Sequence, residues 1–210
     1  SEMCIRDRYM WAGIGDTYAK YYEATISSRG EQLEHFASLG VALSLMCRNP
    51  LLEYGPKAYE DHKKKLSTYD VEQVVLAIVV TTGITSIFLT KDFTPDYNSG
   101  LAHAIFYALT SYPVIEKNHL HGEVVGFGVL LALLVDGEET EFEKIYELNK
   151  KIHLPVSLEE IEITEEQWEE SMNRIPEMSD VAHYPYKVTK EMLSEAMSKL
   201  KERVQEDGEK

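Results

Sequence analysis

The apolar residues of this chain recur mainly at the three- to four-residue spacing of amphipathic helices. Residues 16–26 and 31–47 both follow this rhythm, and the pair Asn49-Pro50 ends the second run. The same spacing predicts six further helices, at residues 70–89, 99–109, 121–135, 138–152, 164–173 and 189–204. The sequence shows neither a convincing alternation of period two nor the strand–helix rhythm of a parallel sheet. The pattern therefore predicts an all-α domain.

Polar residues mark the starts of several predicted helices. Asp70 is expected to cap the helix that it opens, with Gln73 three residues later in the capping-box position. Thr164 stands in the same relation to Gln167, and Thr189 precedes the last helix. Side-chain oxygens at such positions accept hydrogen bonds from backbone N–H groups that the first turn leaves unpaired. We therefore expect helices to begin at these three residues.

The longest apolar stretch, residues 74–89, contains no charged side chain. It is shorter than the ~20 residues that a membrane-spanning helix needs, and Thr81, Thr82 and Gly83 interrupt it. We therefore expect a buried core helix and no membrane partner.

The charge balance narrows the class of partner. Of 210 residues, 21 are basic and 36 acidic, which gives a net charge of −15. Residues 136–210 hold 21 acidic and 10 basic side chains, so −11 of that charge lies in this part. Such a surface repels phosphate backbones and argues against nucleic-acid binding. The two cysteines, Cys4 and Cys47, fit a reducing compartment, and we expect a cytoplasmic protein.

The first eight residues have no apolar periodicity and join directly onto a segment that reads like the middle of a domain. They resemble translated adapter sequence. We interpret residues 1–8 as a non-native lead-in and residues 9–210 as the domain, truncated at its N-terminus.

Three residues could form a metal site. His103 lies in residues 100–109, an apolar segment without charge, and an imidazole buried there without a partner costs about 1–3 kcal/mol. His121 opens a second apolar helix, and Asp16 follows two glycines. Two imidazoles and one carboxylate leave a coordination position open, as in catalytic zinc sites. Taken alone, Asp16 is also explained as a helix N-cap.

Two neighbours of His121 have open roles. Glu123 is a candidate acceptor for the second ring N–H of a metal-bound histidine, and equally a residue that stabilises a helix N-terminus through the dipole. His119 is a candidate proton relay to solvent. Gly126 and Gly128 lie inside the predicted helix and are expected to permit close helix packing.

Three segments together resemble the glycerol dehydrogenases, within the iron-containing alcohol dehydrogenase family. Residues 12–24 (AGIGDTYAKYYEA) are similar to the segment that carries their aspartate ligand. Residues 99–110 (SGLAHAIFYALT) and 121–130 (HGEVVGFGVL) are similar to the segments that carry their two histidine ligands. The order and approximate separations also match. The resemblance covers residues 12–135 well, and the acidic remainder only in its helical character.

The resemblance implies that Asp16, His103 and His121 bind one divalent metal ion, zinc or iron. It implies the all-α fold of the C-terminal half of dehydroquinate synthase-like and iron-containing alcohol dehydrogenases. It further implies NAD- or NADP-linked oxidation of a small alcohol or polyol, and a homo-oligomer when full-length. The family binds the nucleotide in an N-terminal Rossmann-like domain, which has no counterpart here. We therefore expect metal binding, and no turnover, from this chain alone.

Two positions refine the resemblance. The iron alcohol dehydrogenases typically have a histidine four residues after the aspartate, where this chain has Lys20, which favours the three-ligand pattern. Phe106 replaces a second histidine typical of glycerol dehydrogenases, which predicts a less polar substrate pocket. The expected substrate is therefore a small alcohol or polyol, and the sequence does not single out glycerol.

Two rival functions remain. A sugar-phosphate cyclase related to dehydroquinate synthase requires basic residues near the metal, and residues 100–122 offer only Lys117. A non-catalytic helical interaction domain requires no metal, with His103 hydrogen-bonded in the core. Convergence of Asp16, His103 and His121 in space would count strongly against that second rival.

Overall fold

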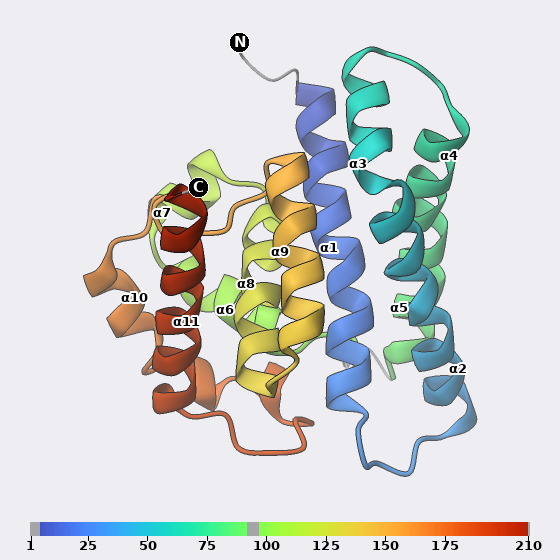
Figure 1. Cartoon of the computed structure of the whole chain (residues 1–210). Helices are drawn as coiled ribbons and strands as arrows, with labels where there is room; N and C mark the ends of the chain where they lie inside the picture. The colour runs from blue at the N-terminus through green and yellow to red at the C-terminus, as the bar shows by residue number, and fades with distance from the viewer. Residues whose placement is uncertain (1–4, 92–96, 210) are drawn as a thin grey trace.

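The computed structural model describes residues 5–91 and 97–209, and these ranges are helical without a β-strand. The prediction of an all-α fold is therefore confirmed. Figure 1 shows α1 near the middle of the molecule, with α2 to α5 on one side and most of the later helices on the other. The helices are α1 (Ile5–Ser27), α2 (His35–Ser44), α3 (Asn49–Lys63), α4 (Tyr69–Leu76), α5 (Thr82–Leu89), α6 (Leu101–Leu109), α7 (Pro113–Asn118), α8 (His121–Asp136), α9 (Glu139–Ile152), α10 (Glu165–Ser171) and α11 (Lys190–Gly208), with short 3-10 turns at Leu45–Cys47, Ile175–Glu177 and Ser179–Val181 and a π-helical turn, η2, at Ala77–Thr81.

Helix α1 begins well before residue 16, where the sequence pattern placed its start. Met10, Trp11 and Ile14 are buried and extend the apolar face of the helix towards its N-terminus. Asp16 consequently lies near the middle of α1, so its interpretation as an N-cap is wrong.

Helix α8 forms the centre of the hydrophobic core. Every residue from Gly122 to Leu134 is buried, and the helix packs against α1, α6, α9 and α11. A helix that is apolar on all sides requires partners all round. Its predicted extent is confirmed, and it ends where Gly137 adopts the left-handed conformation at φ +75°.

Two helices were missed in the sequence. Asn49-Pro50 ends the preceding helical run but also begins α3, because proline fits the first turn of a helix, where no N–H partner is needed. Helix α7 likewise begins at Pro113. The preceding run is also shorter than predicted, since α2 starts at His35.

The caps are largely as expected. Thr164 and Gln167 form a reciprocal capping box at the start of α10, and the Thr189 hydroxyl accepts a hydrogen bond from the backbone N–H of Met192. The assignment of Asp70 as a cap is wrong. Thr68 caps α4 instead, and accepts from the backbone N–H of Val71.

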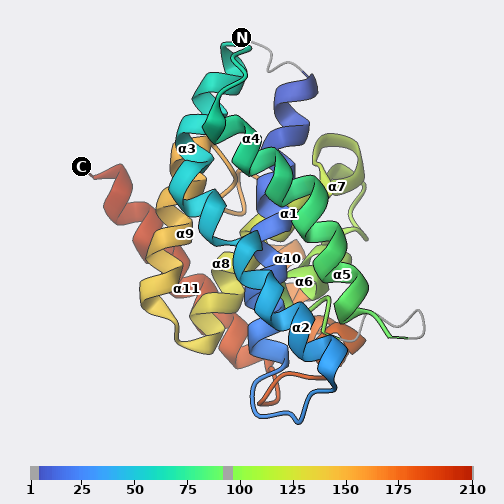
Figure 2. The same cartoon turned by 90° about the vertical axis from the view of Figure 1, so that its right-hand side faces the viewer.

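The apolar run from α4 through η2 to α5 is not the buried core helix that the sequence predicted. By length and composition alone, Tyr69–Leu89 is long and apolar enough to cross a membrane. Only 17% of its most apolar 18-residue stretch is buried. Figure 2 looks onto the face that it builds together with α2. The exposed large apolar side chains on this run are Tyr69, Val75, Leu76, Val79, Val80, Ile84 and Ile87.

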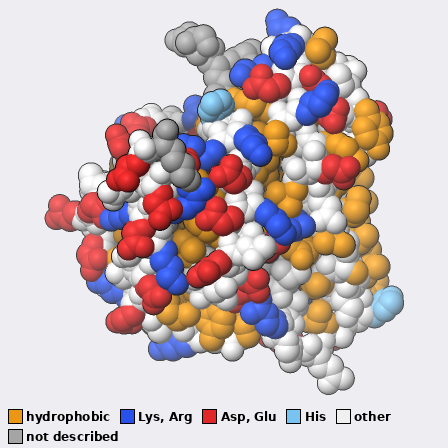
Figure 3. Space-filling view, in the orientation of Figure 1, with side chains coloured by type: hydrophobic (Ala, Val, Ile, Leu, Met, Phe, Trp, Pro, Cys, Tyr) orange, Lys and Arg blue, Asp and Glu red, His pale blue; other side chains and the backbone are white. Residues whose placement is uncertain are grey.

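The acidic part of the chain covers a different surface. Figure 3 shows acidic side chains gathered over α10 and α11. Acidic residues here and on neighbouring α9 pair with basic residues, as Glu143 of α9 does with Arg203 of α11 at 3.1 Å. Most of these pairs are exposed, and exposed ion pairs contribute about 0–1 kcal/mol each.

Candidate metal centre

Three helices bring Asp16, His103 and His121 to one point. Asp16 lies on α1, His103 on α6, and His121 is the first residue of α8. One oxygen or nitrogen atom from each side chain lies within 4.8 Å of those of the other two. The Oδ1 atom of Asp16 is 3.3 Å from Nε2 of His121 and 3.7 Å from Nε2 of His103. The structure therefore groups the three residues singled out in the sequence.

Glycines set the distance between α1 and α8. A Cβ atom added to Gly122 would lie 1.9 Å from the backbone oxygen of Ala12, and one added to Gly15 would lie 2.1 Å from the backbone oxygen of Gly122. Real side chains do not tolerate such distances, so only glycine allows the two backbones to touch here. This crossing places Asp16 beside His121, since both adjoin the contact.

A second glycine contact positions α6 on α8. A Cβ atom on Gly128 would lie 2.7 Å from the backbone oxygen of Ala102, the residue before His103. A Cβ atom on Gly126 would lie 2.6 Å from the hydroxyl oxygen of Tyr18 on α1. The prediction that Gly126 and Gly128 permit close helix packing is therefore confirmed.

The three side chains differ in their exposure to solvent. The side chain of His103 is 6% exposed, that of Asp16 32% and that of His121 42%, so the cluster opens on the His121 side. Burial raises the pKa of Asp16, but His121, Lys20 and His103 outweigh it and lower the pKa to about 2. Asp16 is therefore a carboxylate at neutral pH.

The donor set fits a divalent cation. Oδ1 of Asp16 is buried and has no hydrogen-bond partner, and an unsatisfied buried carboxylate oxygen is costly. In a tetrahedral zinc site with bonds of about 2.0–2.1 Å, neighbouring ligand atoms are about 3.3 Å apart. The two distances to Asp16 are close to that value, which suits atoms that share an ion. Three protein donors leave a position for substrate.

The sequence interpretation overlooked Glu23. This residue is 1% exposed, and its carboxylate contacts Nδ1 of His103 at 2.6 Å. Burial lowers the pKa of His103, but Glu23 outweighs it and raises the pKa above its usual value. The sequence could have indicated Glu23 by its position: it lies two helical turns after Asp16, so the two side chains share one face of the same helix.

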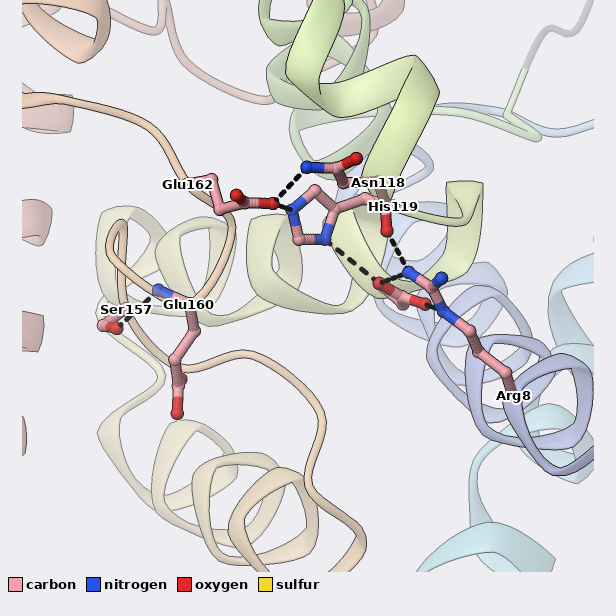
Figure 4. A network of polar contacts seen from close by, with 7 residues as sticks. Arg8, Asn118, His119, Ser157, Glu160 and Glu162 are labelled. Carbon is pink, nitrogen blue, oxygen red and sulfur yellow. Dashed lines mark hydrogen bonds and ion pairs between the residues drawn. The ribbon is translucent and has the colours of Figure 1, made fainter. Parts of the chain in front are cut away.

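The carboxylate of Glu123 bonds to residues other than His121, although the sequence made it a candidate acceptor for the second ring N–H of that histidine. Its carboxylate accepts hydrogen bonds from Arg8 at 2.8 Å and lies 3.1 Å from Nδ1 of His119. On the other side of the His119 ring, the carboxylate of Glu162 lies 3.2 Å from Nε2 (Figure 4). Both ring nitrogens of His119 thus face carboxylates, and its role as a proton relay to solvent stays a prediction. Burial raises the pKa of Glu123, but His119 and Arg8 outweigh burial, so the pKa lies below its usual value.

Other side chains shape the edge of the cluster. The ring of Phe106 meets that of His121 edge to face, with 4.4 Å between centroids. Tyr107 is half exposed, and its ring centroid lies 6.2 Å from that of His103. Lys20 is buried and donates a hydrogen bond to the backbone oxygen of Asn98 at 3.0 Å. The edge of the cluster is thus partly aromatic, and the buried ammonium group of Lys20 already has a hydrogen-bond partner.

No family model matches the chain, but individual proteins do. It is 32% identical over 157 residues to hydroxycarboxylate dehydrogenase A of Escherichia coli (strain K12), which covers 74% of this chain and 42% of that protein. It is 33% identical over 164 residues to glycerol dehydrogenase of Thermotoga maritima, covering 73% of this chain and 41% of that protein. The chain therefore spans less than half the length of these relatives.

A solved structure agrees with the helical arrangement. The crystal structure of glycerol dehydrogenase from Schizosaccharomyces pombe matches with a TM-score of 0.78 at 22% identity, covering 95% of this chain and 52% of that one. At this identity the match supports the fold alone. The sequence matches show that the homologues of this chain are glycerol and hydroxycarboxylate dehydrogenases, which fits the C-terminal helical half of the iron-containing alcohol dehydrogenase family.

Proposed function

We propose that Asp16, His103 and His121 hold one divalent metal ion, zinc or iron, at the catalytic centre of a dehydrogenase for a small alcohol or polyol. The observation that carries this proposal is the convergence of the three side chains around a buried oxygen of Asp16 that lacks a hydrogen-bond partner. The names of the relatives support the reaction class, since they are dehydrogenases of hydroxylated small molecules.

Solvent exposure distinguishes the roles that we propose for the residues around the metal. A bound divalent ion supplies Lewis-acid chemistry that lowers the pKa of a substrate hydroxyl. Asp16 is ionised and balances positive charge, while the buried His103 forms the inner wall. The exposed His121 borders the side from which substrate enters, and Phe106 gives this side an apolar surface. This surface suits a substrate less polar than glycerol.

NAD or NADP, when bound, accepts the hydride. We place its binding in the part of the relatives that lies beyond the matched region, because the chain spans only 41–42% of them. The 210-residue chain is accordingly expected to bind metal and to show no turnover by itself. A protein that also carries the other part is expected to act as a homo-oligomer.

The rivals fit the site less well. A sugar-phosphate cyclase needs basic groups for phosphate, and the candidate in residues 100–122, Lys117, lies exposed at the end of α7. A helical interaction domain gives no reason for three potential ligands from three helices to converge.

The test is metal content. We expect the purified chain to hold about one equivalent of zinc or iron by plasma mass spectrometry, and His103→Ala and His121→Ala to lose it, because each removes one of three ligands. His35→Ala is the matched control, since His35 is an exposed histidine at the start of α2. A folded wild-type chain that takes up no zinc, or variants that retain it, would refute the proposal.

A further inference from the structure

A single buried carboxylate holds both the backbone and the ring of His103. Oε1 of Glu23 accepts a hydrogen bond from the backbone N–H of His103 at 2.9 Å, and Oε2 lies 2.6 Å from its Nδ1. Glu23 is on α1 and His103 on α6, so this contact joins the two helices that carry the first two candidate ligands. Within the described part of the chain, the hydrogen bonds of the Glu23 side chain both go to His103.

The backbone contact serves the start of α6. The N-cap residue of this helix is Gly100, which has no side chain to accept from the first-turn N–H groups. Glu23 supplies that acceptor from another helix, and its negative charge lies at the positive end of the α6 dipole. Gly100 also makes room for it, because an added Cβ atom would lie 3.2 Å from Cγ of Glu23.

The ring contact determines which nitrogen carries the proton. A neutral imidazole has one N–H donor and one lone pair, and an ionised carboxylate can only accept. Nδ1 beside Glu23 must therefore carry the proton, which leaves the lone pair on Nε2. Nε2 is the atom that faces Asp16, at 3.7 Å. Metal-bound histidines commonly have such a partner, which fixes the ring and raises its basicity.

We propose that Glu23 is a positioning residue that holds His103 as the Nδ1–H tautomer and thereby presents Nε2 to the metal. Glu23 does not touch the metal or the substrate. Its effect on metal affinity rests on the proposed function, whereas its effect on the tautomer holds in the metal-free chain as well.

Glu23→Gln is the most informative variant, because it changes chemistry at nearly constant shape. The amide oxygen of glutamine can still accept from the backbone N–H of His103. Its NH₂ group then faces Nδ1 and donates to it, which favours the Nε2–H tautomer and removes the lone pair from Nε2. A residue with a merely structural role would not change the tautomer in this way.

Two readouts test the proposal. Nitrogen-15 NMR of histidine-labelled, metal-free protein, at a pH at which the His103 ring is neutral, is expected to show Nδ1–H in the wild type and Nε2–H in Glu23→Gln. Zinc titration against a chelator is expected to show about 10- to 100-fold weaker binding in the variant. Glu141→Gln is the control, because Glu141 accepts from Tyr22, the neighbour of Glu23, and does not contact the cluster.

The outcomes separate the two proposals. A wild-type His103 with its proton on Nε2 overturns the role of Glu23, and so does a folded Glu23→Gln with unchanged tautomer and zinc affinity. Should Glu23→Gln fail to fold, the wild-type spectrum still decides. A wild type that shows Nδ1–H but takes up no zinc refutes the proposed metal site and leaves the positioning of His103 by Glu23 standing.

Discussion

Helix α8 and the α4–α5 run are both long and apolar, yet they lie in opposite environments. Nearly all of α8 is buried in the centre of the core, while the α4–α5 run exposes a row of large apolar side chains. The difference lies in the glycines. Gly122 and Gly128 of α8 touch the backbones of neighbouring helices, whereas Gly83 of α5 has no atom within 4 Å of where its Cβ would lie.

The comparison teaches that apolar composition does not decide which helix is central. A helix becomes central where other backbones can approach it closely, and here the same contacts bring together Asp16, His103 and His121, the candidate metal ligands. The exposed α4–α5 face builds no such site. Large exposed apolar patches often mark contact surfaces of proteins, so this face is a liability for aggregation of the isolated chain.

The largest difference between the two regions is expected when one glycine in each is replaced by alanine. Gly122→Ala places a Cβ atom 1.9 Å from the backbone oxygen of Ala12, so α1 and α8 cannot keep their native packing. We expect loss of the cooperative thermal transition and of zinc binding. Gly83→Ala is expected to raise the free energy of unfolding by about 0.5–1 kcal/mol, because alanine favours a helix. A Gly122→Ala variant that folds natively and binds zinc would contradict the claim that close backbone contacts at glycine make α8 central.

A smaller effect is expected from side-chain truncation. Leu130 is 0% exposed in α8, and Leu130→Ala should lower the free energy of unfolding by about 2–5 kcal/mol. Ile87 is 73% exposed in α5, and Ile87→Ala should change it by less than about 0.5 kcal/mol. Urea denaturation of both variants gives the two values. Similar losses in both would show that the α4–α5 face is buried in solution, for example against a second copy.

Acid should have the smallest effect, and none of it should arise within residues 74–90 of the α4–α5 run. Burial raises the pKa of Glu141, but Lys144, Arg48 and Tyr22 outweigh it and lower the pKa to about 2. Because the folded pKa is depressed, this stabilisation is present above the ordinary glutamate range and is lost as pH falls towards about 2. The pair is partly exposed, so the loss is at most about 1 kcal/mol. Residues 74–90 carry no charge and contribute nothing directly.

Urea unfolding at pH 6 and pH 3 measures this acid effect. Glu141→Gln is expected to lose less stability between the two values than the wild type does. An equal loss in both proteins would show that other carboxylates account for the acid sensitivity.

Much of the fold followed from the periodicity of the sequence. The extent of α8 and the caps at Thr164 and Thr189 depend on local chemistry, which is readable in the sequence. The starts of α1 and α3 and the exposure of α5 depend on what packs nearby, which local patterns do not contain. A proline that ends one helix can begin the next, and only tertiary contacts distinguish the two outcomes.

The candidate site followed from the sequence only in part. Asp16, His103 and His121 were found through three motifs, and the structure brings them together. Glu23 was missed because its role depends on a contact between α1 and α6, which are separated by 80 residues at this point. Glu123 was assigned by its nearness to His121 in sequence, but its side chain turns to Arg8 and His119 instead.

The most direct test of the metal centre is an anomalous difference map, recorded at the zinc absorption edge from crystals of the zinc-loaded chain. We predict one strong peak bounded by Oδ1 of Asp16 and the Nε2 atoms of His103 and His121. Absence of a peak there, or a peak at another cluster such as His119 and Glu162, would contradict the account.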